Sequence, residues 1–194
     1  MNYHLACGDK HIDGFVNVDI RQTAAADITG NCIGLDFIGD NTTDIIFTNA
    51  FLEHMRYSEI EIFLKNAKRV LNDGGALCVT GIPDAETYCK AYCDGMIDIA
   101  LLHGLTHGSP ERKVNAEYYD QLHRSIFDTR LLENILSRAD WQWVTFLRHG
   151  YIEDPADWHL GFICGNGKEC EWAELDSVTS KTYGQEIRNV VIRQ

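Results

Sequence analysis

Two short apolar runs near the N-terminus, joined by a six-residue connection, open the hydrophobic pattern of the chain. The first run covers residues 3–8 and ends on Gly8, and the second covers residues 15–20 and carries the carboxylate of Asp19. We predict a strand for each. A glycine at a strand end lets a ligand approach the backbone closely, and a carboxylate at the end of the neighbouring strand can accept both hydroxyls of a ribose. The pattern predicts half of a nucleoside pocket at the carboxyl edge of a parallel sheet.

The connection between these runs limits which nucleoside can bind. Dinucleotide-binding folds use a glycine-rich turn that opens a full helix, whose amino end holds the pyrophosphate. Residues 9–14 have room for about one helical turn, and they contain Asp9 and Asp13, which would repel phosphate. We therefore expect a nucleoside without phosphates, of which S-adenosylmethionine is the common one.

The clearest amphipathic helix covers residues 59–71. Its apolar side chains recur at helical spacing, and its basic side chains gather towards the carboxyl end, as the helix dipole favours. Ser58 and Glu61 form the pattern of a capping box at its start. The pair Gly74 and Gly75 is expected to end it.

The other elements complete an α/β pattern. Buried strands predicted over residues 44–48 and 76–82 flank the amphipathic helix, which implies a right-handed parallel crossover. Asp128 is the expected cap of a second amphipathic helix, residues 129–139. Further strands are predicted over residues 26–28, 141–147, 158–164 and 187–193, the last without a place in the sheet. This order predicts a Rossmann-like parallel sheet with one antiparallel strand near the C-terminus, in a three-layer αβα sandwich.

Between the fifth strand and the second amphipathic helix, residues 84–127 depart from strand–helix alternation. An insertion this long at the ligand edge of a sheet is usually functional. It holds two short helical patterns, at residues 85–93 and 96–103, and then a polar loop. Because the first strand begins at residue 2 or 3, we expect no N-terminal segment to cover the cofactor. We therefore expect this insertion to be the substrate lid. It concentrates six polar and aromatic side chains: His103, His107, Tyr118, Tyr119, Asp120 and His123.

Length and charge narrow the range of functions. A chain of 194 residues indicates a single domain, residues 1–194, with one sizeable core. The formal net charge is −12, without a run of basic residues. Nucleic-acid grooves and proteins on anionic membranes need basic surfaces, so we expect neither partner. A small-molecule substrate fits this charge better, and the sequence leaves the oligomeric state open.

The cysteines indicate a reducing compartment. There are seven, an odd number without a repeating spacing, which is typical of reduced thiols in the cytoplasm. The pairs Cys89 with Cys93 and Cys164 with Cys170 lack the spacing of zinc knuckles, so no metal site is predicted. The sequence also shows no signal segment and no apolar run long enough to span a membrane. We expect a cytoplasmic protein.

Six short sequence words follow one another over roughly residues 3 to 140: LACG (5–8), GFVNVD (14–19), DIIFTNAFLEH (44–54), RVLNDGG (69–75), IPD (82–84) and, more weakly, LHRSIF (122–127). In this order and spacing they resemble the class I S-adenosylmethionine-dependent methyltransferases, and within them the small bacterial branch with a shortened first connection. The chain departs from the family at three positions: His4 stands where an acid is common, Ala6 replaces a usual glycine, and Asn31 replaces a common aspartate.

The resemblance implies a cofactor site at the carboxyl ends of the first, second and fourth strands. Asn31 would contact the adenine amine with Cys32 beside the ring, and Asn49 would bind the amino-acid part of the cofactor. Other roles remain open, because Asn31 can equally cap a turn, Phe51 can belong to the core and His54 can hold its loop. The full set of implied cofactor-binding residues is Ala6, Cys7, Gly8, Asp19, Ile20, Asn31, Cys32, Asn49, Ala50, Phe51 and His54.

Methyl transfer from a sulfonium asks the protein mainly to position the nucleophile and to exclude water. A hydroxyl acceptor also needs a base, for which histidine is the usual choice at neutral pH. We predict that His123 is this base, because it lies at the end of the lid within the motif LHRSIF, which has a counterpart in the family. A backbone-bonded structural histidine is the alternative, and His107 is the second candidate base.

Three functions remain open from the sequence. The first is methyl transfer from S-adenosylmethionine to an oxygen or nitrogen of a sugar, a metabolite or a surface-polysaccharide precursor. The second is a non-catalytic nucleoside-binding module or degenerate partner subunit, to which the departures at His4, Ala6 and Asn31 give weight. The third is a nicotinamide-dependent sugar-nucleotide enzyme, against which the missing pyrophosphate helix counts heavily.

Overall fold

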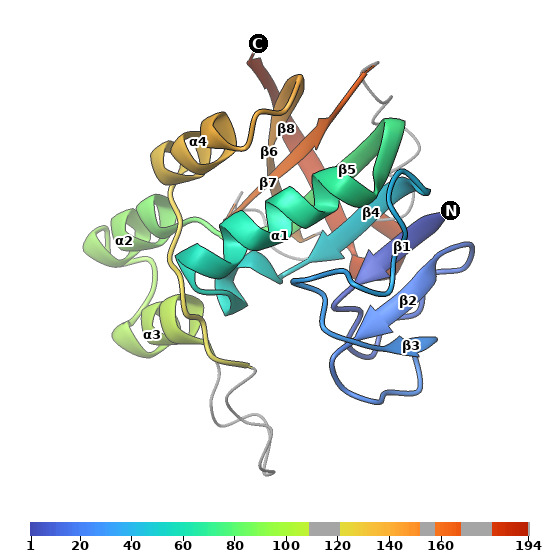
Figure 1. Cartoon of the computed structure of the whole chain (residues 1–194). Coiled ribbons are helices and arrows are strands. Elements are labelled where there is room, and N and C mark those ends of the chain that lie inside the picture. Colours follow the sequence, from blue (N-terminus) through green and yellow to red (C-terminus); the bar gives the residue numbers. More distant parts are fainter. Residues whose placement is uncertain (109–120, 152–157, 168–179, 194) are drawn as a thin grey trace.

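A single eight-stranded sheet forms the centre of the molecule, in the order β3-β2-β1-β4-β5-β7-β6-β8 (Figure 1). The computed structural model describes residues 1–108, 121–151, 158–167 and 180–193. The strands are β1 (Asn2–Leu5), β2 (Val16–Asp19), β3 (Ile28–Thr29), β4 (Thr43–Asn49), β5 (Leu71–Pro83), β6 (Trp143–Tyr151), β7 (His159–Gly165) and β8 (Gln185–Arg193). Strands from both ends of the described chain therefore share one sheet.

The strand directions confirm the predicted Rossmann-like sheet and add one strand to it. β1 to β5 pair in parallel. β7 pairs antiparallel with both β5 and β6, so it is the predicted antiparallel strand. β8, which the sequence did not place, pairs antiparallel with β6 at the edge. Two strands rather than one therefore run against the others.

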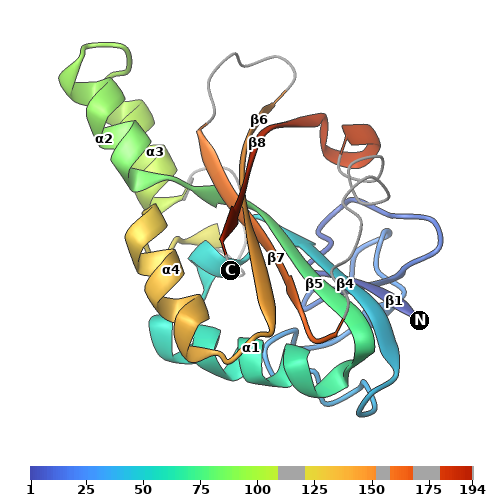
Figure 2. The same cartoon turned by 90° about the horizontal axis from the view of Figure 1, so that it is seen from above.

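The helices lie mainly on one face of this sheet. They are the 3-10 turn η1 (Leu52–His54) and the helices α1 (Tyr57–Val70), α2 (Ala85–Cys93), α3 (Ile99–His107) and α4 (Thr129–Arg138). Figure 2 shows α1 and α4 on one side and the helical turn of residues 180–183 on the other. The larger core cluster lies under α1 and α4. On the opposite face a smaller cluster packs against Phe15 and Tyr183, so the described part of this layer consists of short segments.

Helix α1 forms as its amphipathic pattern predicts, but its ends differ from the prediction. It begins at Tyr57, where the Glu59 carboxylate accepts a 2.7 Å hydrogen bond from the Arg56 backbone N–H. The predicted capping pair Ser58 and Glu61 is therefore wrong. The helix ends at Val70 because the next residue is already extended and belongs to β5.

The glycine pair predicted to end α1 lies inside β5 instead. Gly75 is needed there for a close approach, since a Cβ atom at this position would lie 2.8 Å from the Thr43 carbonyl oxygen of β4. A side chain would separate the two strands. The glycines that read as a helix stop in the sequence therefore permit strand pairing.

Aspartate caps start the three other helices. Asp84 accepts a hydrogen bond from the Glu86 N–H. Asp128 accepts one from the Leu131 N–H, as predicted. Asp98 caps α3 in the same way, which moves this helix three residues beyond its predicted start. α2 and α3 follow the carboxyl end of β5 and pack against each other at that end of the sheet (Figure 1). Among the described residues, no helix is long and apolar enough to span a membrane.

His4 of β1 has a structural role. It is fully buried, its Nδ1 lies 2.9 Å from Oδ1 of Asn17 in β2, and its Nε2 lies 2.7 Å from the Tyr183 hydroxyl. The Asn17 oxygen also accepts the Ile12 N–H, so the His4 Nδ1–H donates to it and Nε2 accepts from tyrosine. A neutral imidazole thus joins β1 and β2 to the segment that carries Tyr183. Burial lowers the pKa of His4 from 6.5 to about 4.

We expect mild acid to destabilise the protein through His4. The unfolded chain takes up this proton near pH 6.5, whereas the folded chain resists it until about pH 4. The contribution is therefore complete above pH 6.5 and falls by about 1.4 kcal/mol per pH unit below it. Urea unfolding between pH 7.5 and pH 5 should show a shallower pH dependence in His4→Gln than in the natural protein. Equal slopes would contradict this assignment, because the other buried histidines are present in both proteins.

Candidate functional site

A pocket of about 310 Å³ lies at the carboxyl ends of β1, β2 and β4. Open parallel sheets bind ligands at this edge, and the volume falls in the range of small-molecule sites, about 300–1,000 Å³. The walls come from the strand ends, from the connection after β3, from η1 and from the segment that precedes α4. The lining residues are Ala6, Gly8, Asp19, Ile20, Arg21, Asn31, Cys32, Ile33, Ala50, Phe51, His54, Met55, Glu59, Gln121 and Arg124.

Asp19 fixes the geometry at the end of β2. Its Oδ2 accepts the Gly8 backbone N–H at 2.8 Å, and its Oδ1 accepts the Arg21 backbone N–H at 2.9 Å and the Arg21 Nε–H at 3.2 Å. The side chain is 4% exposed. A carboxylate offers about four acceptor sites, so one remains on Oδ2 for a hydroxyl from the pocket, and Oδ1 gains another when the Arg21 side chain gives up its bond. The predicted pairing of Gly8 and Asp19 is therefore present in the structure.

Two alanines at the ends of β1 and β4 turn the backbone sharply into the pocket. Ala6 has a φ of 53° and Ala50 a φ of 51°, in the left-handed region that favours glycine. Such conformations cost about 1–3 kcal/mol and cluster at functional sites. The conformation at Ala6 explains why glycine is usual in the family at this position, and it shows that alanine can adopt the same turn.

Most of the cofactor-binding residues predicted from the sequence line this pocket, and two do not. Cys7 is buried behind the strand end, where its backbone N–H donates to the Val18 carbonyl. Asn49 turns towards β5, where its Oδ1 accepts a 3.0 Å hydrogen bond from the Thr80 hydroxyl. The others, Ala6, Gly8, Asp19, Ile20, Asn31, Cys32, Ala50, Phe51 and His54, surround one cavity.

Some of these residues combine a structural role with their place on the pocket wall. Asn31 accepts the Ile33 N–H at 2.8 Å and so caps a turn. Phe51 packs edge-to-face on Phe63 of α1, with ring centroids 5.6 Å apart. The alternatives left open for these two residues are therefore compatible with each other.

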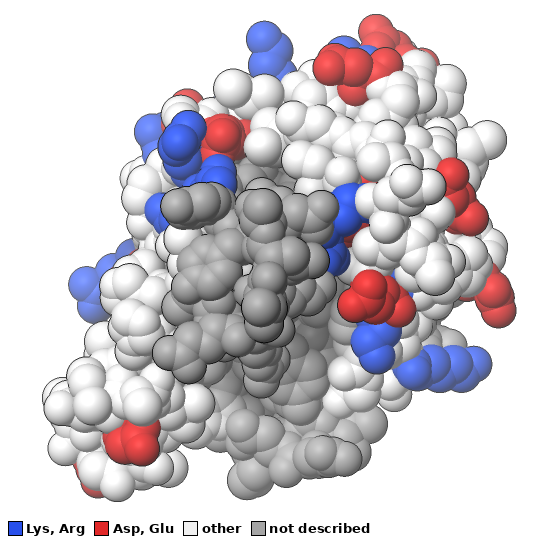
Figure 3. Space-filling view, turned by 90° about the horizontal axis from the view of Figure 1, so that it is seen from below, with Lys and Arg blue, Asp and Glu red and all other residues white. Residues whose placement is uncertain are grey.

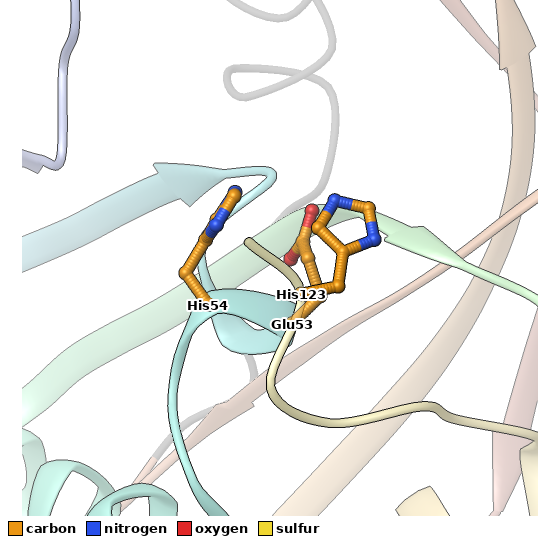
Figure 4. Close-up of side chains that lie close together, drawn as sticks. All are labelled: Glu53, His54 and His123. Atoms are coloured by element: carbon orange, nitrogen blue, oxygen red, sulfur yellow. The ribbon is translucent and has the colours of Figure 1, made fainter. Parts of the chain in front are cut away.

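His54, on the wall of the pocket, meets Glu53 and His123, neither of which lines the pocket (Figure 4). One ligand atom from each of the three side chains lies within 4.8 Å of the others. The two imidazole rings are edge-to-face with centroids 5.1 Å apart. Burial lowers the pKa of His54 to about 4 and also lowers that of His123, while it raises the pKa of Glu53 to about 8.

Hydrogen bonds to η1 bring His123 to this place. The Glu53 carbonyl accepts the Arg124 and Ser125 backbone N–H groups at 2.6 and 3.1 Å, and the Ser125 hydroxyl donates to the Met55 carbonyl at 2.6 Å. The His54 Nδ1 lies 3.2 Å from the Leu122 carbonyl oxygen. The end of the insertion is thus fixed on the turn that follows β4.

Six residues of the pocket wall were not predicted from the sequence. Arg21 lies two residues after Asp19, and Glu59 was predicted only as the start of a helix. Gln121 and Arg124 flank His123, but their approach depends on the long-range hydrogen bonds to η1. Ile33 and Met55 complete the set. Tyr118, Tyr119 and Asp120 lie outside the described residues, while His103 and His107 stack on the exposed side of α3.

The connection between β1 and β2 contains only turns, as predicted. It therefore provides no helix amino end for a pyrophosphate. This geometry disfavours a dinucleotide and is compatible with a nucleoside whose ribose meets Asp19 beside Gly8.

Comparison with known proteins gives a sequence match and several structural matches. Residues 11–79 match the family model described as Methyltransferase domain. No curated protein matches the chain. Among solved structures, an S-adenosylmethionine-dependent methyltransferase from Thermotoga maritima, described as a possible histamine N-methyltransferase, has a TM-score of 0.53 at 14% identity, covering 84% of this chain and 80% of that one.

Two further structures show the same likeness. A Methanosarcina mazei S-adenosylmethionine-dependent methyltransferase has a TM-score of 0.53 at 17% identity, covering 86% of this chain and 92% of that one. The Burkholderia thailandensis 1,6-didemethyltoxoflavin-N1-methyltransferase, solved with its substrate and S-adenosylhomocysteine, has a TM-score of 0.54 at 11% identity, covering 86% of this chain and 71% of that one.

The chain has the fold of the class I S-adenosylmethionine-dependent methyltransferases, and the match of residues 11–79 to a methyltransferase family model agrees with the resemblance seen in the sequence. The matches support an enzyme, and they support S-adenosylmethionine as its cofactor.

Asp19→Asn keeps the size of the side chain but removes its charge. We expect it to weaken S-adenosylmethionine binding by about 1.5–3 kcal/mol, the range of hydrogen bonds to a charged group. Calorimetric titration measures this change. Asp36→Asn, at an exposed position away from the pocket wall, is the matched control and should bind as the natural protein does. Unchanged affinity in a folded Asp19→Asn variant would remove Asp19 from the site.

Proposed function

We propose that this protein transfers the methyl group of S-adenosylmethionine to an oxygen or nitrogen of a small molecule: a sugar, a metabolite or a surface-polysaccharide precursor. The observation that carries the proposal is the pocket in which Gly8 and Asp19 meet at the carboxyl edge of the sheet without a phosphate-binding helix. This arrangement suits a nucleoside whose remaining part extends along the ends of β1 and β4 towards His54.

Methyl transfer in such a site is an in-line displacement. The acceptor atom attacks the methyl carbon while the electron pair of the carbon–sulfur bond returns to the sulfonium, which becomes a neutral thioether. The cofactor supplies the leaving group, so the protein contributes orientation and exclusion of water. We assign the acceptor to the end of the pocket lined by His54, Gln121 and Arg124, because these residues lie beyond the strand ends that would hold the nucleoside.

We propose that the insertion, residues 84–127 within a single domain of residues 1–194, acts as the substrate lid. Its described parts support this role. α2 and α3 stand at the carboxyl edge of the sheet, and His123 hydrogen-bonds the Leu105 carbonyl of α3 at 3.0 Å (Figure 1). α3 buries no side chain and exposes Ile99 and Leu101. An apolar helix that is little packed in the free protein suits a cover for substrate.

The surface supports a small-molecule partner rather than a nucleic acid or a membrane. In the face shown in Figure 3, acidic and basic side chains are interspersed over the described residues, and no continuous basic stripe crosses them. Two structural neighbours are described as methyltransferases of small nitrogen compounds, one as a possible histamine N-methyltransferase and the other as a 1,6-didemethyltoxoflavin-N1-methyltransferase. We place the protein in the cytoplasm, in line with the free thiols at Cys7, Cys32, Cys78, Cys89, Cys93 and Cys164.

Calorimetric titration with S-adenosylmethionine and S-adenosylhomocysteine, with NAD as the control, tests the cofactor. We expect micromolar binding of both sulfur nucleosides and none of NAD. Incubation with S-adenosylmethionine and panels of hydroxyl and amine acceptors, followed by mass spectrometry for S-adenosylhomocysteine, then tests turnover. Silence with all three ligands would contradict the proposal and favour a degenerate binding module, and binding of NAD alone would favour a nicotinamide enzyme.

His123 is the side chain that we assign to the acceptor's proton. His123 does not itself line the pocket, but its ring lies against that of His54, which does, while its Nδ1 is held by the α3 carbonyl. His123→Asn should therefore leave S-adenosylmethionine affinity unchanged within a factor of about two and lower turnover by about 10²-fold or more, as expected for loss of proton-transfer catalysis. Single-turnover kinetics with a hydroxyl acceptor measure this. Wild-type turnover in the variant would return His123 to a structural role.

A further inference from the structure

The cluster of Glu53, His54 and His123 has a feature that a general base does not need. Three different ligand atoms, a carboxylate oxygen and one nitrogen from each ring, gather within 4.8 Å of one another at the edge of the cofactor pocket (Figure 4). Glu53 and His54 come from η1, and His123 comes from the end of the insertion. The fold thus brings His123 to two side chains that precede it by 70 and 69 residues in the sequence.

The hydrogen bonds of the two histidines leave the same nitrogen of each ring available to this cluster. The Nδ1 of His54 faces the Leu122 carbonyl at 3.2 Å, and the Nδ1 of His123 faces the Leu105 carbonyl at 3.0 Å. A carbonyl oxygen only accepts, so each Nδ1 carries the hydrogen, and each neutral ring keeps its lone pair on Nε2. Metal-binding histidines are oriented in this manner, by donation of the other ring N–H to a backbone carbonyl or carboxylate.

Glu53 supplies a buried carboxyl oxygen that lacks a partner in the described part of the chain. It is 2% exposed, and its Oε2 has no hydrogen-bond partner among the described residues. Nor does a described lysine or arginine form an ion pair with it. Burial of an unpaired carboxylate is costly, and buried charges in proteins are paired or coordinate metals. A cation between the carboxylate and the two imidazoles would remove this cost.

We propose that Glu53, His54 and His123 bind a divalent transition-metal ion, of which Zn²⁺ is the type, and that the ion receives the acceptor's hydroxyl at an open position. Two histidines and one glutamate are a known ligand set for catalytic zinc, which keeps a further position for water or substrate. Ligands of a tetrahedral ion with bonds of about 2.1 Å lie about 3.4 Å apart. Binding of an ion would draw the three ligand atoms, which lie within 4.8 Å of one another, to this separation.

The inference rests on the proposed methyl transfer and narrows its acceptor to oxygen. A bound hydroxyl loses its proton to water more readily because the metal charge stabilises the alkoxide. The alkoxide oxygen then forms a bond to the methyl carbon as the carbon–sulfur pair returns to sulfur. With its Nε2 lone pair on the ion, His123 assists the loss of the acceptor's proton as a metal ligand and not as the general base. The sequence predicted no metal site, and this proposal differs from that prediction.

Titration of the metal-free protein with Co²⁺ and Zn²⁺ tests the site without reference to turnover. We expect one ion per chain with micromolar or tighter affinity, a visible Co²⁺ spectrum of a four- or five-coordinate nitrogen–oxygen site, and displacement of Co²⁺ by Zn²⁺. Glu53→Gln and His123→Asn should each weaken binding at least tenfold. Two independent variants keep the test decisive if one of them fails to fold, which urea unfolding reveals.

The chain offers a matched control for adventitious binding. His103 and His107 lie one helical turn apart on α3, with stacked rings whose centroids are 4.7 Å apart. Such an exposed pair can also hold a transition metal. The double variant His103→Asn/His107→Asn should bind Co²⁺ as the natural protein does. Absence of binding, or binding that is lost in this control and kept in Glu53→Gln and His123→Asn, would overturn the proposal.

The inference and the proposed function fail separately. S-adenosylmethionine binding and methyl transfer that proceed equally in metal-free protein would leave the function standing and overturn the metal site. A metal bound through Glu53 and His123 in a protein that does not bind S-adenosylmethionine would do the reverse.

Discussion

The site depends on one interaction, the hydrogen bonds by which the Asp19 carboxylate holds the Gly8 backbone and Arg21. β1 and β2 are parallel neighbours whose register pairs Leu5 with Val18, so their carboxyl ends reach the same edge of the sheet. The connection between the two strands, residues 6–15, contains turns and no helix, and it brings the glycine directly against the carboxylate. The floor of the nucleoside pocket and the exclusion of a pyrophosphate therefore have one physical cause.

A second set of bonds joins that floor to the chemistry. The Glu53 carbonyl accepts hydrogen bonds from the Arg124 and Ser125 N–H groups, and the His54 Nδ1–H donates one to the Leu122 carbonyl. These bonds hold the end of the insertion on η1. This contact brings His123 beside His54 and places Gln121 and Arg124 on the pocket wall. Because His123 of this segment also hydrogen-bonds the Leu105 carbonyl of α3, movement of the proposed lid would change the position of the proposed metal ligands. Cofactor binding and acceptor binding thus use different but touching parts of the fold.

The sequence predicted what short-range patterns determine. Gly8 and Asp19 are 11 residues apart, and strand period and turn chemistry suffice to bring them together. The sequence failed where distant backbone decides: Gly75 looked like a helix stop and serves the close approach of β4 and β5, and β8 could not be placed because its partner β6 is chosen by the whole sheet. The role of Glu53 was missed for the same reason, since it depends on a histidine 70 residues away.

A crystal structure of the protein with S-adenosylhomocysteine would test the central claim most directly. The account predicts density in the pocket at the ends of β1, β2 and β4, with both ribose hydroxyls on Asp19, adenine beside Asn31 and Cys32, and the sulfur towards His54. A ligand bound elsewhere, or bound in this pocket with its ribose away from Asp19, would contradict it.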